Sequence, residues 1–275
     1  MSLKIDAGGG GSPGGANRSS TTGDSWWETI KIVIHALIIA MVVRVFFYQP
    51  FNIPSGSMKS TLLIGDYLFV SKLSYGYSRY SFPFGLPPFS GRVFASAPKR
   101  GDVAVFKLPR DNSTDYIKRV IGLPGDTIEM RQGVLFINGQ AVPKRRVDTF
   151  ADVDEDGIRR NIPRFEETLP NGVKYLVLDA EPNGPYDNVG PYNVPAGHYF
   201  MMGDNRDNST DSRATYQVGY VPYENLVGRA DIIFFSYDGV CPDALPETQP
   251  IRFFVGSWCT IKNSVRFGRL FNLVR

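Results

Sequence analysis

The sequence predicts a mostly β protein in which one apolar helix near the N-terminus precedes a region of antiparallel sheets. Of its 275 residues, 43% are hydrophobic and 21% are charged, which is typical of a globular chain with a core of its own. One long apolar run follows a glycine-rich start. The rest of the chain contains short runs of β-branched and aromatic residues bounded by Gly, Pro, Asn or Asp, without a long amphipathic helical pattern.

Residues 1–25 predict a flexible tail inside the cell, because they contain the stretch "GGGGSPGG" and precede an apolar segment. That segment, residues 26–48, has 23 residues. As a helix it would be about 34 Å long, and a bilayer core needs about 20 residues. Trp26 and Tyr48 mark its two ends, as aromatic side chains do at membrane interfaces. The pattern predicts a membrane-spanning helix, with a buried core helix or an interfacial helix as alternatives. A mild excess of basic residues on the tail side places residues 49–275 outside the cytoplasm.

The region after the helix contains seven runs with the composition of strands. They are residues 65–73, 101–109, 115–123, 126–142, 174–180, 198–204 and 229–239. Asn138-Gly139 is typical of a type I′ hairpin turn. Residues 143–172 are polar and poorly periodic, which predicts an inserted region or a long loop.

The C-terminal segment, residues 250–275, has five basic residues and no acidic ones, with aromatic and aliphatic side chains between them. It is typical of a segment that lies on an anionic membrane surface, and equally of a terminal strand and helix packed on the domain with a solvated basic face. Cys241 and Cys259 are the only cysteines, and their spacing leaves a disulfide and two free thiols both open.

Composition also excludes several kinds of site. A formal net charge of +3 gives no general argument for nucleic acid binding. Two cysteines cannot form a Cys-rich zinc site. The acidic stretch "DVDEDG" at 152–157 resembles the start of a calcium loop, but its twelfth position is Pro163 where an EF-hand needs Glu. We therefore expect no metal site.

Two serines in "IPSGSMKSTLLIGD", residues 53–66, are candidate nucleophiles. Ser55 and Ser57 are also small residues two apart after an apolar run, which is the pattern of a signal-peptide cleavage site in the chain itself. The apolar run exceeds the usual signal-peptide core of about 7–15 residues, so this second interpretation is the weaker one.

A serine nucleophile needs a base, and His198 and a buried lysine are the two candidates. A lysine removed from water can be neutral near pH 7. Lys118 lies in "DYIKRVIGLPGD", residues 115–126, where a period of two places it on one strand face and Arg119 on the other. An edge strand with an outward-pointing lysine is the alternative. A third stretch, "GDNRDNSTDSR" at 203–213, is a loop that could orient such a lysine or simply hold itself by Asx turns.

These three stretches, in this order after a membrane helix, closely resemble bacterial type I signal peptidases, the membrane-bound Ser/Lys leader peptidases. The resemblance covers most of residues 49–135 and 197–235. It implies a signal-peptidase/SOS-repressor-protease-like fold with a core of about 49–142 and 197–240 and a variable insertion of about 143–196. It also implies a serine endopeptidase without metal or cofactor, single-pass in the bacterial cytoplasmic (inner) membrane, with its catalytic region on the extracytoplasmic side.

By this resemblance Ser57 is the nucleophile and Lys118 the general base. The Ser55 side chain and the Ser57 backbone N–H form the oxyanion hole, and Ser209 orients the lysine. The positions that resemble substrate-binding ones are Phe51, Ile53, Met58, Leu62, Tyr116 and Ile117.

The same resemblance makes Asp211 and Arg213 a supporting ion pair and gives Arg119 a structural role. The sequence departs from the family at Ser60, where proline is usual. Proline would stiffen that turn, so the departure puts the local geometry in question.

The implied partners are the signal peptides of exported preproteins, cut after small residues in an A-x-A-like pattern, and membrane lipid. We expect a monomer that binds no nucleic acid. A pilin-processing peptidase of a conjugative system is an alternative of the same type. A catalytically dead, membrane-anchored peptide-binding protein is an alternative of another class. The joint presence of Ser57, Lys118 and Ser209 argues against the second alternative.

Overall fold

The computed structural model describes residues 22–82, 89–153, 159–238 and 265–274, and the chain divides into two units, residues 1–41 and residues 42–275. Cys241 and Cys259 lie outside the described residues. The described part of the first unit belongs to helix α1, Thr22–Phe46, which continues into the second unit. Its stretch Trp26–Phe46 is long and apolar enough to cross a membrane. Its side chains are not buried, so it is not the core helix that the sequence left open.

Helix α1 ends two residues earlier than predicted. Phe47 N–H makes the last helical hydrogen bond, to Val43 O at 2.8 Å. Tyr48 already belongs to strand β1, Tyr48–Asn52, where it pairs with Ser71. Proline at position 50 explains the early end, because the residue before a proline is pushed out of the helical region.

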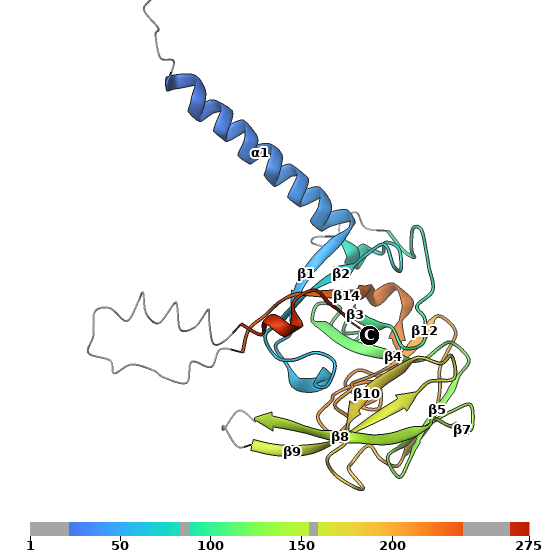
Figure 1. Cartoon of the computed structure of the whole chain (residues 1–275). Coiled ribbons are helices and arrows are strands. Elements are labelled where there is room, and N and C mark those ends of the chain that lie inside the picture. Colours follow the sequence, from blue (N-terminus) through green and yellow to red (C-terminus); the bar gives the residue numbers. More distant parts are fainter. Residues whose placement is uncertain (1–21, 83–88, 154–158, 239–264, 275) are drawn as a thin grey trace, which may run out of the picture. The chain divides into compact units, whose positions relative to one another are not determined.

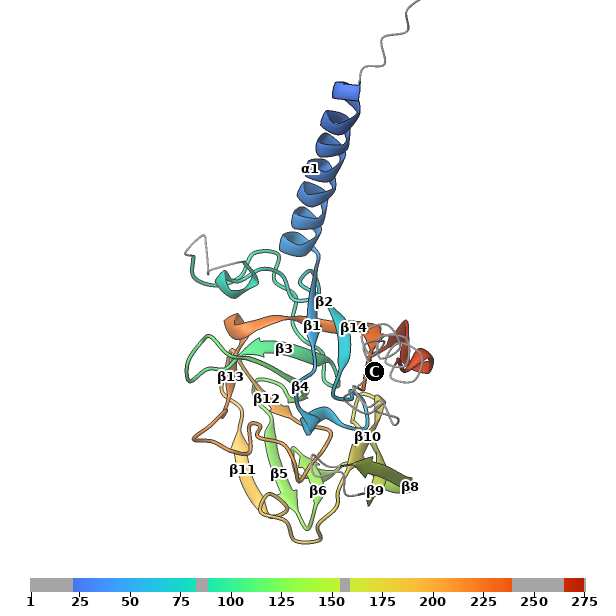
Figure 2. The same cartoon turned by 90° about the vertical axis from the view of Figure 1, so that its left-hand side faces the viewer.

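The predicted fold class, mostly β with antiparallel sheets, is confirmed (Figure 2). The largest sheet has eight strands in the order β1-β2-β14-β3-β4-β12-β13, with β15 added beside β14. After β1, its strands are β2 (Asp66–Ser71), β3 (Val103–Lys107), β4 (Asp115–Gly122), β12 (His198–Met202), β13 (Val221–Pro222), β14 (Leu226–Ser236) and β15 (Asn272–Leu273). Short 3-10 turns η1 (Gly56–Met58), η2 (Arg79–Ser81), η4 (Tyr223–Asn225) and η5 (Phe267–Arg269) lie in the connections.

Two smaller sheets complete the second unit. One contains β5 (Thr127–Arg131), β6 (Val134–Ile137), β7 (Gln140–Ala141) and β11 (Val189–Asn193). Its β6–β7 turn confirms the predicted hairpin, because Asn138 and Gly139 both have positive φ, 53° and 78°, as a type I′ turn requires.

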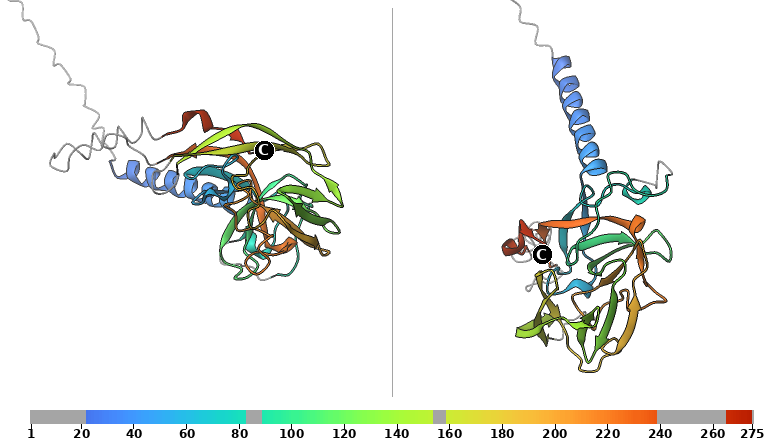
Figure 3. Two further views of the ribbon diagram at one scale, coloured as in Figure 1. Left: turned by 90° about the horizontal axis from the view of Figure 1, so that it is seen from below. Right: turned by 90° about the vertical axis from the view of Figure 1, so that its right-hand side faces the viewer.

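The other sheet corrects the prediction of a long loop at 143–172. It contains β8 (Lys144–Val153), β9 (Arg159–Thr168) and β10 (Lys174–Leu178), and β8 and β9 form a long hairpin (yellow-green in Figure 3). Most side chains of β8 and β9 are at least partly exposed. A strand without one buried face lacks the apolar–polar alternation on which the sequence prediction depended.

The described end of the C-terminal segment, residues 265–274, packs on the β-rich unit. Strand β15 pairs with β14, and the Arg269 guanidinium bonds to both carboxylate oxygens of Asp66 (3.0 and 2.5 Å). This part of the segment therefore follows the packed alternative. Residues 250–264 and 275 lie outside the described residues.

Strand β4 lies in the interior of the large sheet. It pairs with β3 on one side and with β12 on the other, so it is not the edge strand that the sequence left open. Its two faces contact different core clusters, with Val120 in one and Ile121 in another. The sheet therefore buries the side chains on both faces of β4, including the neighbours Lys118 and Arg119.

Gly122 at the end of β4 leaves no room for a side chain. An added Cβ would lie 2.7 Å from Phe200 Cβ and 2.9 Å from Ile128 Cγ1. Gly122→Ala should therefore lower the free energy of unfolding by about 1–3 kcal/mol through overpacking. Urea unfolding in detergent measures the change. Gly268→Ala is the control, because nothing lies within 4 Å of its Cβ position; equal stability of the two variants would contradict the prediction.

Candidate active site

Ser57 lies in the short turn η1, which follows β1 and returns the chain toward β2. The next residue, Met58, holds the turn on the core, because its side chain is completely buried in the same cluster as Leu62. Asn205 holds the turn from the other side. Its backbone N–H donates to Ser57 O (3.1 Å) and its side-chain amide donates to Gly56 O (3.0 Å). The Ser57 side chain is thus carried by a backbone that is fixed on two sides.

Lys118 reaches Ser57 from β4. The distance between Lys118 Nζ and Ser57 Oγ is 2.7 Å, and Nζ also donates to Ile117 O at 2.9 Å. Nζ lies over the ring of Tyr116, 5.3 Å from its centre. The side chain of Lys118 is 3% exposed, so its amine is almost completely removed from water. The structure brings together the two residues that the sequence placed 61 positions apart.

Burial gives this lysine an unusual acidity. It lowers the pKa of Lys118 from its ordinary value of 10.5 to about 8, although the negative charges of Asp211 and Asp204 act in the opposite direction. A substantial fraction of the amine is therefore neutral near physiological pH. In that form nitrogen can accept the Ser57 hydroxyl proton, which is what a general base requires.

Ser55, the predicted oxyanion donor, lies at the exposed rim of the same turn. Its Oγ is 3.4 Å from Ser57 Oγ, and either hydroxyl can be the donor. A hydroxyl at this place can turn toward a carbonyl oxygen bound beside Ser57. The geometry is compatible with the predicted role, and the role itself stays a prediction.

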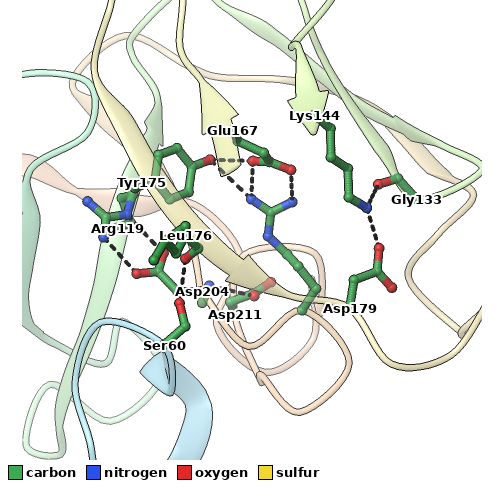
Figure 4. A network of polar contacts seen from close by, with 12 residues as sticks. Ser60, Arg119, Gly133, Lys144, Glu167, Tyr175, Leu176, Asp179, Asp204 and Asp211 are labelled. Carbon is green, nitrogen blue, oxygen red and sulfur yellow. Dashed lines mark hydrogen bonds and ion pairs between the residues drawn. The ribbon is translucent and has the colours of Figure 1, made fainter. Parts of the chain in front are cut away.

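Arg119 points to the opposite side of β4 from Lys118 and is completely buried. Its guanidinium bonds to both carboxylate oxygens of Asp204 at 2.8 and 2.6 Å, as Figure 4 shows. Thr61, four residues after Ser57, donates its hydroxyl to Asp204 at 2.5 Å. Arg119 thus connects β4, through Asp204, to the turn that follows Ser57, in agreement with the structural role that the resemblance implies for it.

Asp211 and Arg213 form the predicted ion pair. The Arg213 guanidinium bonds to both Asp211 oxygens at 2.9 and 2.8 Å, and Gly203 N–H donates to the same carboxylate at 3.0 Å. Burial of Asp211 opposes its ionisation, but the charge and hydrogen bonds of Arg213 hold its pKa below the ordinary value. The pair therefore keeps the loop 203–213 folded against β12 and β4.

Ser209 is buried beside Asp211 and does not contact Lys118 in the predicted way. Its hydroxyl helps to lower the pKa of Asp211, yet its oxygen makes no hydrogen bond of normal geometry in the described part of the chain. The structure thus places Ser209 at the site without the hydrogen bond to the lysine. Its orienting role stays a prediction.

A second buried network supports the loop and was missed by the sequence analysis. Arg206 bonds to both oxygens of Glu167 at 2.9 and 2.6 Å, and the Tyr175 hydroxyl donates to Glu167 at 2.6 Å (Figure 4). The Arg119 guanidinium stacks 4.4 Å from the centre of the Tyr175 ring. The only available signal was the charge density of the loop 203–213, because Glu167 lies in the stretch that was interpreted as an insertion or loop.

A cavity of about 630 Å³ opens beside Ser57 and Lys118, a size suited to a few residues of peptide. Four of the six predicted substrate-binding residues line it: Phe51, Ile53, Tyr116 and Ile117. Met58 and Leu62 do not line it, because both are completely buried in the core beneath. Tyr186 and Thr210 line the cavity and were not predicted.

His198, the alternative base, takes no part in this arrangement. It is partly exposed at the start of β12, where its ring Nδ1 interacts with Ala196 O at 3.0 Å. The base nearest to Ser57 is therefore the lysine.

Among the residues that the structure describes, one group of carboxylates lies close enough together to hold a cation. Ligand oxygens of Asp179, Asp187 and Asp207 lie within 4.8 Å of one another. Each already accepts hydrogen bonds, from the Lys144 side chain to Asp179, from Gly184 N–H to Asp187, and from the backbone of residues 180 and 181 to Asp207. Each of the three carboxylates thus has a hydrogen-bond donor from the protein itself.

A serine hydroxyl in contact with a buried lysine, carried by a β-rich unit, is the arrangement found in Ser/Lys hydrolases. Comparison with known proteins narrows this class. The family model "Signal peptidase, peptidase S26" matches residues 26–235, and the chain belongs to that family of serine peptidases.

Two relatives that are similar in sequence agree with this assignment. The chain is 47% identical to a signal peptidase I of Rickettsia typhi over 208 residues, which are 73% of this chain and 76% of the relative. It is 42% identical to a signal peptidase I of Rickettsia akari over 229 residues, 80% and 82% of the two chains. A crystal structure of a signal peptidase I from Enterococcus faecalis V583 is 28% identical, covers 49% of this chain and 97% of its own, and has a TM-score of 0.28.

Gly203 allows the loop 203–213 to approach Ser57 closely. A Cβ at this position would lie 2.1 Å from Ser209 Oγ and 2.6 Å from Ser57 O. Gly203→Ala should displace both residues and lower the rate of peptide cleavage about 10–100-fold, since small displacements of reacting groups cost this much. A cleavage assay on the folded variant measures the loss, with Gly268→Ala as control. An unchanged rate in Gly203→Ala would show that the close approach has no role in the reaction.

Proposed function

We propose that this protein removes N-terminal signal peptides from exported preproteins, with Ser57 as the nucleophile and Lys118 as the general base. The observation that carries the proposal is the 2.7 Å contact between Ser57 Oγ and the Nζ of a buried lysine whose pKa is lowered to about 8. Membership in the signal peptidase family supports the substrate class.

The proposed reaction is acyl transfer in two steps. Neutral Lys118 takes the proton of the Ser57 hydroxyl while Oγ attacks the carbonyl carbon before the cut. The Ser55 hydroxyl and the Ser57 N–H donate to the developing oxyanion, and one such donor is worth about 3–4 kcal/mol. Protonated Lys118 then gives its proton to the leaving amine. The neutral lysine next takes a proton from the water that attacks the acyl-enzyme, and Ser57 recovers its own proton from the lysine.

The substrate would bind as an extended strand beside residues 51–54 and 115–118. Both segments line the cavity, and Phe51, Ile53 and Ile117 give it aliphatic and aromatic walls near Ser57. Such walls leave room for small side chains only, which fits cleavage after alanine-like residues. We infer that the preprotein is the partner and that the enzyme works as a monomer.

The proposed location is the bacterial cytoplasmic membrane, with one span and the β-rich unit on the extracytoplasmic side. The exposed apolar helix Trp26–Phe46 supports a membrane anchor. Anchoring would keep Ser57 near the membrane surface where signal peptides emerge, which raises their effective concentration at the site.

Removal of either reacting group should abolish cleavage. Ser57→Ala lacks the nucleophile and Lys118→Ala lacks the base, so each should lower the rate at least about 1,000-fold. Incubation of the purified full chain with a preprotein, followed by mass determination of the new N-terminus, measures both rate and cleavage position. Ser90→Ala, at an exposed serine, is the control. Near wild-type cleavage by Lys118→Ala would refute the proposed dyad.

The pH dependence of the rate should report the lowered pKa of Lys118. The lysine acts as a base only when neutral, so kcat/KM should rise with pH and level off above an apparent pKa of about 8. A lysine with the ordinary pKa of 10.5 would instead give a rise that continues to that pH. A pH–rate profile with a single preprotein distinguishes the two. A rise still continuing near pH 10 would mean that Lys118 is not held neutral by burial.

A further inference from the structure

The residues directly after the nucleophile form a tight turn with one unusual conformation. Thr61 N–H donates to Met58 O at 3.1 Å, Lys59 has φ −51° and ψ 142°, and Ser60 has φ 95°. These features describe a type II β-turn, in which the third residue needs positive φ and is usually Gly or Asn. Serine at this position is strained, because its Cβ crowds the backbone.

The Ser60 hydroxyl makes a bond that accounts for serine at this strained position. It donates to Leu176 O at 2.6 Å, across 116 residues of sequence (Figure 4). Leu176 belongs to β10, in a different sheet from the strands that flank the turn. Proline, which is usual here in the family, has its φ fixed near −65° and could neither adopt this conformation nor donate this bond. Serine in place of the family's proline therefore goes together with the positive φ and the hydrogen bond at position 60.

Two neighbouring contacts act on the same turn. The Lys59 ammonium bonds to Asp152 of β8 at 2.6 and 2.8 Å, and Thr61 bonds to Asp204. The Lys59 and Asp152 side chains are only 12% and 16% exposed, so this ion pair also holds the turn. It acts through the full length of the lysine side chain, whereas the Ser60 bond runs from a short side chain to a main-chain oxygen. Ser60 is the residue that ties the turn directly to the main chain of the β8–β10 sheet.

We propose that Ser60 is a positioning residue whose hydroxyl, bonded to Leu176 O, holds the type II turn in the arrangement that directs Ser57 Oγ at Lys118 Nζ. The inference rests on the proposed function of Ser57 and Lys118. Loss of the bond detaches the turn from Leu176 O and lets its backbone move, and the Ser57–Lys118 contact lengthens with it. Because the chemical step depends steeply on that distance, the effect falls on kcat rather than on substrate binding.

The test compares two variants of the full chain in detergent micelles with one preprotein. Ser60→Gly keeps the positive φ without strain but removes the hydroxyl, and should lower kcat about ten-fold while KM stays unchanged. Ser60→Asn also tolerates positive φ, and its amide N–H can replace the hydroxyl as donor to Leu176 O. It should recover most of the lost kcat. Ser90→Ala is the matched control and should behave as the wild type.

Three outcomes would overturn the inference. One is a folded Ser60→Gly variant with kcat within about two-fold of the wild type. Another is a Ser60→Gly variant with raised KM and unchanged kcat, which would assign Ser60 to substrate binding. The third is a folded Ser60→Asn variant that recovers nothing. The proposed function fails separately, if the wild type leaves the preprotein intact or Ser57→Ala still cleaves it, and the role of Ser60 then fails with it.

Discussion

The site depends on one ammonium group being removed from water. Lys118 Nζ can take a proton from Ser57 only if burial lowers its pKa, and the shift from 10.5 to about 8 costs the folded state about 3 kcal/mol below pH 8. The sign follows from the order of the two pKa values. Between pH 8 and 10.5 the unfolded chain binds the extra proton, so this cost shrinks as the pH rises through that range. The rest of the fold has to supply the stability that Lys118 removes.

The same requirement explains why the nearby acids are paired. Asp204 and Asp211 both raise the pKa of Lys118, and an unpaired carboxylate in their place would keep the lysine charged. Instead, both oxygens of each carboxylate accept hydrogen bonds from one guanidinium group. Asp204 pairs in this way with Arg119, and Asp211 with Arg213. The guanidinium charges offset the carboxylates, while the hydrogen bonds fix the loop 203–213 and β4. Removing one member of such a buried pair costs about 3–5 kcal/mol, so these pairs also tie the loop to the sheet.

The sequence sufficed for the parts that have local signals. The period of two located β4, and Asn138-Gly139 predicted the hairpin turn between β6 and β7, because both signals depend on neighbours in the chain. Resemblance to a family brought Ser57 and Lys118 together. The burial of Glu167 could not be predicted. Its partner Arg206 lies 39 residues away, so in the sequence Glu167 cannot be distinguished from an exposed acid. The strands β8 and β9 were missed for a related reason, since a hairpin without one buried face has no periodic signal.

Ser60 shows most clearly which contacts the sequence alone could not predict. Its strained φ and its bond depend on a tight turn and on a strand 116 residues away, and neither is visible in the letters "SMKSTL". The acceptor is a main-chain carbonyl, which every residue type supplies. The residue type at position 176 therefore gives no information about the contact. Sequence comparison can register the interaction only at position 60, as serine where proline is usual. Position 176 can therefore vary in sequence and still accept the bond from Ser60, provided that the backbone of β10 keeps its place.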